Sequence, residues 1–210
     1  MKNIKAIIFD LGGVLLNISY QNTIDSFKKL GVKNTDDFYS KKTQTHIFNL
    51  IETGKITAEQ FLNDLQELTD NATIKEVKDA WNSMLLDLPD SRLDLLLSLK
   101  RKYKLFLLSN TNTIHIKAIS NKLGKPQWKD FCNLFDKMYL SHEIGVRKPD
   151  IEAFQFILNQ QKLNPNEVLF IDDSPQHIEG AKKLGIICYH LIDGEDITTL
   201  FPDKVQLALH

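Results

Sequence analysis

Polar side chains that could act together on one substrate recur where short apolar runs of this chain end. Four such clusters occur along the sequence: Asp10, Ser109-Asn110, Lys148 and Asp172-Asp173. Three of them follow apolar runs typical of buried strands, whereas Lys148 precedes Pro149, a residue suited to the first position of a helix. Because open parallel sheets bind ligands at the carboxyl ends of their strands, we expect all four clusters to meet at one sheet edge.

The chemistry that these side chains suit is hydrolysis of a phosphate monoester. Three neighbouring carboxylates repel one another, and a divalent cation that prefers hard oxygen ligands, such as Mg²⁺, relieves the repulsion. Ser109, Asn110 and Lys148 would bind the phosphoryl oxygens and stabilise the transition state. Asp10 would attack phosphorus and form an aspartyl-phosphate that water then cleaves. Asp10 and Lys148 are the predicted catalytic residues.

The composition points to a protein that acts on small molecules. Its 210 residues include 26 Lys and Arg against 27 Asp and Glu, so a net charge of −1 argues against nucleic acid or an anionic membrane as the main partner. We find no signal peptide and no apolar segment near the length of a membrane span. The interpretation is a cytoplasmic protein, monomeric or weakly dimeric, with Cys132 and Cys188 as core thiols.

Apolar runs alternate with helical patterns through most of the chain, which predicts an α/β fold. The expected fold is a Rossmann-like parallel sheet with helices on both faces. Strands are expected at residues 5–9, 104–110, 137–141, 168–173 and 186–191, and helices at residues 90–102, 113–123, 149–161 and 175–184.

Residues 17–87 lack a comparable strand and predict an inserted all-helical cap, which leaves residues 1–16 and 88–210 as the core. Helices are expected near residues 20–30 and 36–51. Thr57 and Thr73 each begin a capping-box pattern, with Gln60 and Glu76 three residues later. The alternative arrangement is that these helices pack on the flank of the sheet.

The four clusters together resemble the motifs of the haloacid dehalogenase superfamily of hydrolases. The matching segments, in family order, are Phe9-Asp10-Leu11-Gly12-Gly13-Val14, Leu108-Ser109-Asn110, Arg147-Lys148-Pro149 and Phe170-Ile171-Asp172-Asp173-Ser174. The resemblance implies a Rossmann-like core with a helical cap, Mg²⁺ dependence, and Asp10 as the nucleophile.

Within the superfamily the chain is most similar to small bacterial phosphatases that act on α-D-glucose 1-phosphate. The shared phrases include Leu108-Ser109-Asn110-Thr111-Asn112, Tyr139-Leu140-Ser141 and Ile178-Glu179-Gly180-Ala181. The resemblance implies a metal site formed by Asp10, the backbone carbonyl of Gly12, and Asp173, with Asp172 as a further ligand or as the group that orients Asp173.

One position departs from the usual pattern of the superfamily, in which a second Asp follows two residues after the nucleophile and serves as general acid. Here that position is Gly12. A missing general acid typically removes a factor of about 10²–10⁴ where the leaving group needs a proton. We therefore expect a substrate with a weakly basic leaving oxygen, such as a sugar 1-phosphate. Water or a cap residue, His46, Glu52 or Lys55, could also supply the proton.

Two other functions fit parts of the same pattern. A haloacid dehalogenase needs no general acid, but the Asp172-Asp173 pair argues against an anionic haloacid substrate. A catalytically weak member that binds a metabolite or a protein as a regulator is the second alternative, and the retained Asp10 and Lys148 argue against it. A phosphomutase needs the acid missing at Gly12.

Some cap and histidine residues complete the predictions. The cap residues expected to contact substrate are Tyr20, His46, Phe48 and Glu52. The tryptophans Trp81 and Trp128 are expected in the core, and four histidines are expected at the surface or as satisfied core residues: His115, His142, His177 and His190.

Overall fold

A computed structural model describes residues 4–33 and 46–201, and at its centre is a parallel sheet of five strands in the order β3-β2-β1-β4-β5. The strands are β1 (Ala6–Phe9), β2 (Lys104–Ser109), β3 (Lys137–Leu140), β4 (Val168–Asp172) and β5 (Ile187–His190). In the central register, Ile7 lies opposite both Leu105 and Leu169. The carboxyl ends of β1, β2 and β4 therefore meet at one edge, as the sequence predicts.

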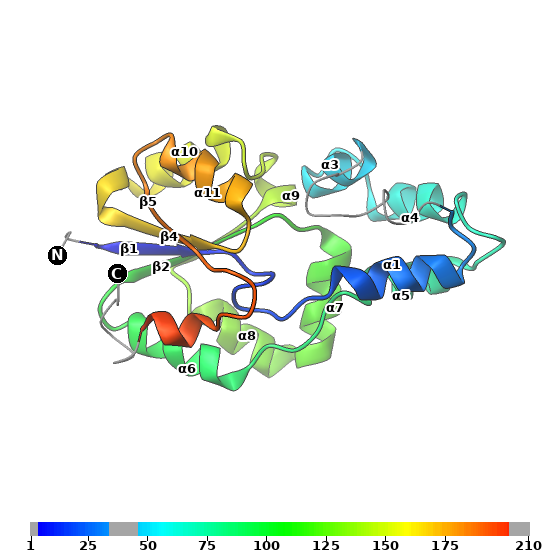
Figure 1. Cartoon of the computed structure of the whole chain (residues 1–210), viewed down its shortest axis with the longest axis horizontal. Coiled ribbons are helices and arrows are strands. Elements are labelled where there is room, and N and C mark those ends of the chain that lie inside the picture. The colour runs from blue at the N-terminus through cyan, green and yellow to red at the C-terminus, as the bar shows by residue number, and fades with distance from the viewer. Residues whose placement is uncertain (1–3, 34–45, 202–210) are drawn as a thin grey trace.

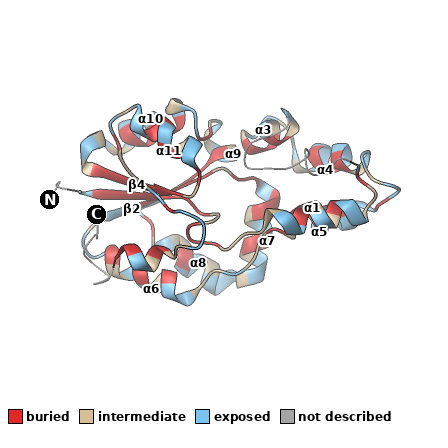
Figure 2. Cartoon of the chain, in the orientation of Figure 1, coloured by how far each residue is buried: buried red, intermediate tan, exposed pale blue. Residues whose placement is uncertain are grey.

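Helices cover both faces of this sheet. Successive strand residues point to opposite faces, and each face carries apolar side chains that the helices bury. They are α6 (Asp90–Leu99), α7 (Thr113–Leu123), α8 (Lys125–Asn133), α9 (Ser141–Ile144), α10 (Ile151–Gln161) and α11 (Pro175–Lys182). Ile7 and Phe9 pack in one cluster with Leu95 of α6, whereas Ile8 packs in another with Phe154 of α10. Figure 1 shows α10 and α11 on one side of the sheet and α6 and α8 on the other, and Figure 2 shows the central strands between them as largely buried.

A second group of helices extends from the edge where the site residues gather (Figure 1). These helices are α1 (Tyr20–Lys29), α3 (His46–Glu52), α4 (Ala58–Gln66) and α5 (Ile74–Asn82). Both predicted capping boxes are present, since Thr57 and Thr73 cap α4 and α5 and exchange hydrogen bonds with Gln60 and Glu76. We call these helices the cap.

The cap has its own apolar cluster, centred on the fully buried Trp81. The Trp81 ring stacks on Phe48, with the ring centroids 5.3 Å apart, and meets Phe61 edge-on at 4.9 Å. Ile114 of α7 belongs to the same cluster, so the cap is packed against the first turn of a core helix. The expectation that Trp81 is a core residue is confirmed.

Two short segments that lie side by side join the cap to the core. Ile18 and Leu85 form an antiparallel bridge, and backbone hydrogen bonds connect Ser19 to Met84 and Asn17 to Asp87, with N–O distances of 2.9 and 2.8 Å. This pairing holds the entry and exit of the cap at one place above the sheet edge.

The predicted fold class, a parallel Rossmann-like sheet with an inserted helical cap, is confirmed. The division into residues 1–16 with 88–210 and residues 17–87 stays a prediction. Of the helix expected at residues 36–51, residues 36–45 lie outside the described residues, and α3 begins at His46. Helices α8 and α9 were not expected.

Two smaller predictions were wrong. Pro149 is not the first residue of a helix, because Asp150 N donates to Arg147 O at 3.0 Å, which closes a turn before α10 begins at Ile151. Cys132 and Cys188 are free thiols that are only partly buried, since α8 and β5 lie at the outside of the fold.

Candidate active site

Lys148 lies at the centre of the sheet edge, between two carboxylates. Its Nζ is 2.8 Å from Asp10 Oδ1 and 2.7 Å from Asp172 Oδ2, and its side chain is fully buried. Asp10 directly follows β1 and Asp172 ends β4, the neighbouring strand. Residues separated by more than 130 positions in the sequence are thus brought into one charged cluster by the parallel pairing of β1 with β4.

The two carboxylates differ in how well their charge is balanced. Burial raises the pKa of Asp10 to about 8 against the opposing charge of Lys148, and the negative charges of Asp172 and Asp173 add to the rise. Burial alone would also raise the pKa of Asp172, but Lys148 and His177 bring it down to about 2. Asp172 is therefore the permanent partner of Lys148, and Asp10 is the carboxylate that still lacks compensation.

His177 is the site residue that the sequence analysis missed. Its Nδ1 is 2.9 Å from Asp172 Oδ1, and burial, then the charge of Lys148, lower its pKa. The neutral ring therefore donates Nδ1–H to the carboxylate. The prediction of a surface or satisfied core residue agrees with this hydrogen bond but did not place His177 beside Asp172, where the first turn of α11 brings it to the end of β4.

Asn110 forms two hydrogen bonds to the backbone of Lys148. Its Nδ2 donates to the Lys148 carbonyl at 2.8 Å, and its Oδ1 accepts from the Lys148 backbone N–H at 2.9 Å. Ser109, the last residue of β2, is buried, and it lines a cavity together with Asp10. The predicted role of Asn110 as a phosphate donor thus rests on its second amide N–H, and its evident structural work is to fix Lys148.

The loop after Asp10 lies directly against the Asp173 carboxylate. Gly13 has φ +79°, and a Cβ at this position would collide with the Asp173 carboxylate, so only glycine permits this approach. At Gly12 an added Cβ would lie 3.2 Å from Ile18 Cδ1. The space that a second acid would need is therefore partly filled by Ile18 of the cap linker.

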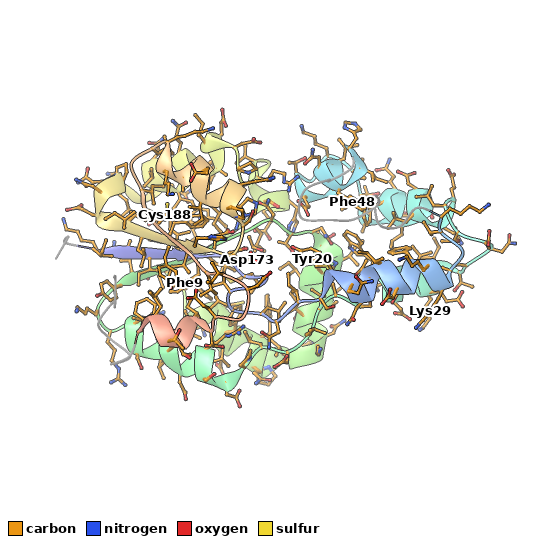
Figure 3. All side chains as sticks on the ribbon, viewed as in Figure 1. Phe9, Tyr20, Lys29, Phe48, Asp173 and Cys188 are labelled. Atoms are coloured by element: carbon orange, nitrogen blue, oxygen red, sulfur yellow. The ribbon has the colours of Figure 1, made fainter. Side chains whose placement is uncertain are left out.

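These groups line a cavity of about 90 Å³ between the sheet edge and the cap. From the core it is lined by Asp10, Ser109, Asn110 and Asp173 among others, and from the cap side by Tyr20, Glu52, Met84 and Leu85. Figure 3 shows Asp173 at the edge of the sheet and Tyr20 at the base of the cap. A cavity this small suits a phosphoryl group with a small leaving group.

Glu52 joins the cap to the loop that carries Lys148. It ends α3, it is 4 % exposed, and its Oε2 lies 3.0 Å from Arg147 Nη2. The same Arg147 donates through Nη1 to Asn49, one helical turn earlier. Burial raises the pKa of Glu52 to about 7, against the opposing charge of Arg147. Burial therefore favours the protonated form of Glu52, and the charge of Arg147 favours the carboxylate.

The other cap candidates are placed differently. Of the four predicted substrate contacts, Tyr20 and Glu52 line the cavity, whereas His46 is exposed and Phe48 is fully buried in the cap cluster. Lys55, a predicted proton donor, is also exposed. Burial strongly raises the pKa of Tyr20, and the charge of Asp173 adds to the effect.

The residues fit a divalent cation. Three carboxylates, those of Asp10, Asp172 and Asp173, lie near one buried ammonium, that of Lys148, and burial raises the pKa of Asp10 further. Hard oxygen donors of this kind suit Mg²⁺. Among the described residues, Asp10, Asp172 and His177 also present ligand atoms within 4.8 Å of one another, but Asp172 and His177 are already bonded to each other. The predicted ligand set of Asp10, Gly12, Asp172 and Asp173 stays a prediction.

The chain that carries this arrangement of an acid after β1, a hydroxyl at the end of β2, and a lysine paired with the acid of β4 also matches a family model over most of its length. The model of haloacid dehalogenase-like hydrolases matches residues 4–185. The chain belongs to this family. Within the part that the structure describes, no helix is long and apolar enough to cross a membrane.

Relatives extend the likeness over nearly the whole chain. A D-ribitol-5-phosphate phosphatase of Bacteroides thetaiotaomicron is 36 % identical over 198 residues, which cover 92 % of this chain and 94 % of the relative. A haloacid dehalogenase family enzyme of the same species, solved in complex with magnesium and inorganic phosphate, is 38 % identical with a TM-score of 0.83, and the match covers 94 % of this chain and 99 % of that one.

A second solved relative has the same fold. A HAD-like family hydrolase of Porphyromonas gingivalis is 32 % identical with a TM-score of 0.83, and the match covers 95 % of this chain and 97 % of the relative. These relatives are phosphatases or hydrolases of one family, and the chain is a hydrolase of that family.

Proposed function

We propose that this protein is a Mg²⁺-dependent phosphatase that hydrolyses a small phosphorylated metabolite through a phosphoenzyme on Asp10. The observation that supports it most is the position of Asp10. Its carboxylate follows β1, faces a small cavity, and is held by the Lys148 ammonium and by the Leu11 backbone N–H through the same oxygen, Oδ1. Oδ2 is therefore the oxygen that attacks phosphorus.

Each neighbouring group has a task in this reaction. Lys148 balances the charge of Asp10 and of the incoming phosphoryl group. Asp172 holds the Lys148 ammonium in place, His177 holds Asp172, and Asn110 fixes the backbone of Lys148. Ser109 donates its hydroxyl to a phosphoryl oxygen. Because these groups are buried and mutually bonded, they require no reorganisation when the charge moves from Asp10 to phosphate.

The metal would be held by Asp10, the Gly12 carbonyl and Asp173, with Asp172 nearby. When bound, it would lower the repulsion between the carboxylates and the phosphoryl group. Two observations support this set: the Asp173 carboxylate lies against Gly13, beside the loop of Gly12, and a relative 38 % identical is solved with magnesium and phosphate.

We further propose that the preferred substrate is a sugar 1-phosphate. Position 12 carries no acid, and a leaving oxygen that is a weaker base, as at an anomeric carbon, should depart faster whether or not a cap residue donates a proton. The relative named as a D-ribitol-5-phosphate phosphatase suggests the competing class, phosphates of primary alcohols. Both classes are small polyhydroxy compounds, and they differ in the basicity of the leaving group.

The test is phosphate release from a panel of small esters, measured with Mg²⁺ and again with a chelator. The proposal predicts metal-dependent release, with sugar 1-phosphates turned over faster than the matching 6-phosphates and than ribitol 5-phosphate. Equal rates for the three would refute the substrate class but leave the phosphatase. No phosphate release from any ester, with halide released from 2-haloacids, would make the protein a dehalogenase.

A further inference from the structure

The active site lacks an acid where the superfamily usually has one, yet the cavity contains other groups that carry a proton. Apart from Asp10 and the predicted metal ligand Asp173, the titratable groups among its described lining residues are Tyr20, Glu52, His115 and His177. The question is which of these four could protonate a leaving oxygen.

Two of these groups, both histidines, use their N–H on the protein itself. His115 Nε2 donates to the Trp81 carbonyl at 3.2 Å, and burial lowers its pKa to about 4, so the other ring nitrogen carries no proton at neutral pH. His177 donates Nδ1–H to Asp172. Neither ring has a second proton to give.

The remaining two groups come from the cap. Tyr20 is held in its protonated form because burial raises its pKa strongly, so it is a poor acid. Glu52 differs, because its pKa of about 7 is near the working range of a general acid. Its Oε2 accepts no hydrogen bond from any described residue, although the Arg147 guanidinium lies 3.0 Å away.

From this placement we propose that Glu52 of the cap is the general acid and base of the reaction, in place of the acid missing at Gly12. The inference rests on the proposed phosphatase function. It selects one of the three cap candidates suggested by the sequence, since His46 and Lys55 are exposed and Glu52 is buried at the cavity.

The proton balance of both steps is closed by this residue. As Asp10 bonds to phosphorus and the ester P–O bond breaks, the Glu52 proton moves to the leaving oxygen and the product departs as an alcohol. Arg147 then stabilises the Glu52 carboxylate that remains. In the second step this carboxylate takes a proton from the water that attacks the phosphoenzyme, which frees Asp10 and phosphate and restores protonated Glu52.

The charged groups around Glu52 fix the direction of its pH dependence. Arg147 and Lys148 face it from the loop before α10 and favour the carboxylate, whereas burial favours the acid and prevails. Tyr20 of α1 lines the same cavity as Glu52. The backbone carbonyl of His142, in α9, lies against Gly54, two residues after Glu52. The acids of α4, Glu59 and Asp64, are exposed.

Leaving-group dependence tests the proposal. The probes are ethyl phosphate, whose alkoxide is a strong base, and 4-nitrophenyl phosphate, whose phenolate leaves without a proton. Glu52→Gln should lower kcat/KM for ethyl phosphate by about 10²-fold or more and leave the nitrophenyl ester within about threefold. Ethyl phosphate has no hydroxyl group, so lost contacts to substrate hydroxyls cannot cause this difference. Asn49→Ala, which removes the other α3 contact of Arg147, should affect both esters equally.

A second measurement needs no variant. In the wild type, kcat/KM for ethyl phosphate should fall as the pH rises through about 7, while 4-nitrophenyl phosphate lacks this limb. Equal losses for the two esters in Glu52→Gln, or matching pH profiles in the wild type, would overturn the role of Glu52 and leave the phosphatase standing. Absence of wild-type activity on both esters would instead refute the phosphatase itself.

Discussion

At the scale of single residues, the absence of a side chain at Gly12 and at Gly13 shapes the site as much as its acids do. Gly13 allows the Asp173 carboxylate to approach the first loop, and Gly12 removes an acid whose space is partly occupied by Ile18. Position 13 requires glycine because of its positive φ and its contact with Asp173, and glycine at position 12 leaves that position without a general acid. Each leads to a prediction that a matched variant can test.

Gly13→Ala should disable the metal site. The added Cβ would displace Asp173, so we expect the Mg²⁺ concentration for half-maximal activity to rise about tenfold or more. The matched control is Gly124→Ala, which has φ +78° but open space around its Cβ. Both variants should lose about 1–3 kcal/mol of stability through backbone strain. An unchanged Mg²⁺ requirement in Gly13→Ala would show that Asp173 is not a ligand.

An acid placed back at position 12 should replace Glu52. Because Ile18 is 3.2 Å from the site of the new Cβ, the variant is Gly12→Asp with Ile18→Ala, made in the Glu52→Gln background. We expect it to recover at least about tenfold in kcat/KM for ethyl phosphate and little for 4-nitrophenyl phosphate. The control carries Ile18→Ala and Glu52→Gln alone. If both proteins had the same activity, the leaving group would not be limited by protonation.

At the scale of helices and strands, local sequence signals predicted most of the elements of both the core and the cap. The capping boxes at Thr57 and Thr73 and the apolar runs of the strands agree with the structure because the interactions concerned are local. Helix α8 escaped prediction because it follows α7 directly, with Gly124 serving both as the end of one helix and the start of the next.

The contacts that complete the site could not be predicted in the same way. Asn110 bonds to the backbone of Lys148 across 38 residues, and no local pattern encodes that pairing. His177 could have been found, because a residue two positions into a helix that follows Asp172-Asp173 returns to the strand end. Its signal was the short spacing of five residues from Asp172.

Thr73→Ala should destabilise the cap without changing the chemistry. The substitution removes the side-chain acceptor for Glu76 N and its bond to the Glu76 carboxylate, which costs about 1 kcal/mol of stability. Denaturant unfolding measures this loss, and kcat for 4-nitrophenyl phosphate should stay at the wild-type value. A large fall in kcat would mean that α5 contributes to the site beyond its packing in the cap.

At the scale of the whole molecule, cap and core are joined by contacts of several kinds. The paired linkers at Ile18 and Leu85, the apolar contact of Ile114, and the Glu52–Arg147 ion pair connect them. Gly54 also lies directly against the His142 carbonyl. Stability is therefore coupled to the protonation of Glu52, the buried acid of this ion pair.

The coupling predicts how stability varies with pH. The folded pKa of Glu52, about 7, exceeds its ordinary value of 4.5, so the folded state binds the extra proton between these values. The contribution is fully present below pH 4.5 and is lost as the pH rises through 7. Relative to Glu52→Gln, the wild type should lose on the order of 1–3 kcal/mol between pH 5 and 8. Denaturant unfolding at both pH values checks this, and a constant difference would contradict it.

The most direct test of the account is phosphate release by Asp10→Asn, measured beside the wild type with 4-nitrophenyl phosphate and Mg²⁺. Asparagine keeps the shape of the side chain and removes the nucleophile, so the account predicts a loss of at least about 10³-fold in kcat. Circular dichroism and thermal unfolding would establish that the variant is folded. Turnover by folded Asp10→Asn at the wild-type rate would contradict the aspartyl-phosphate mechanism.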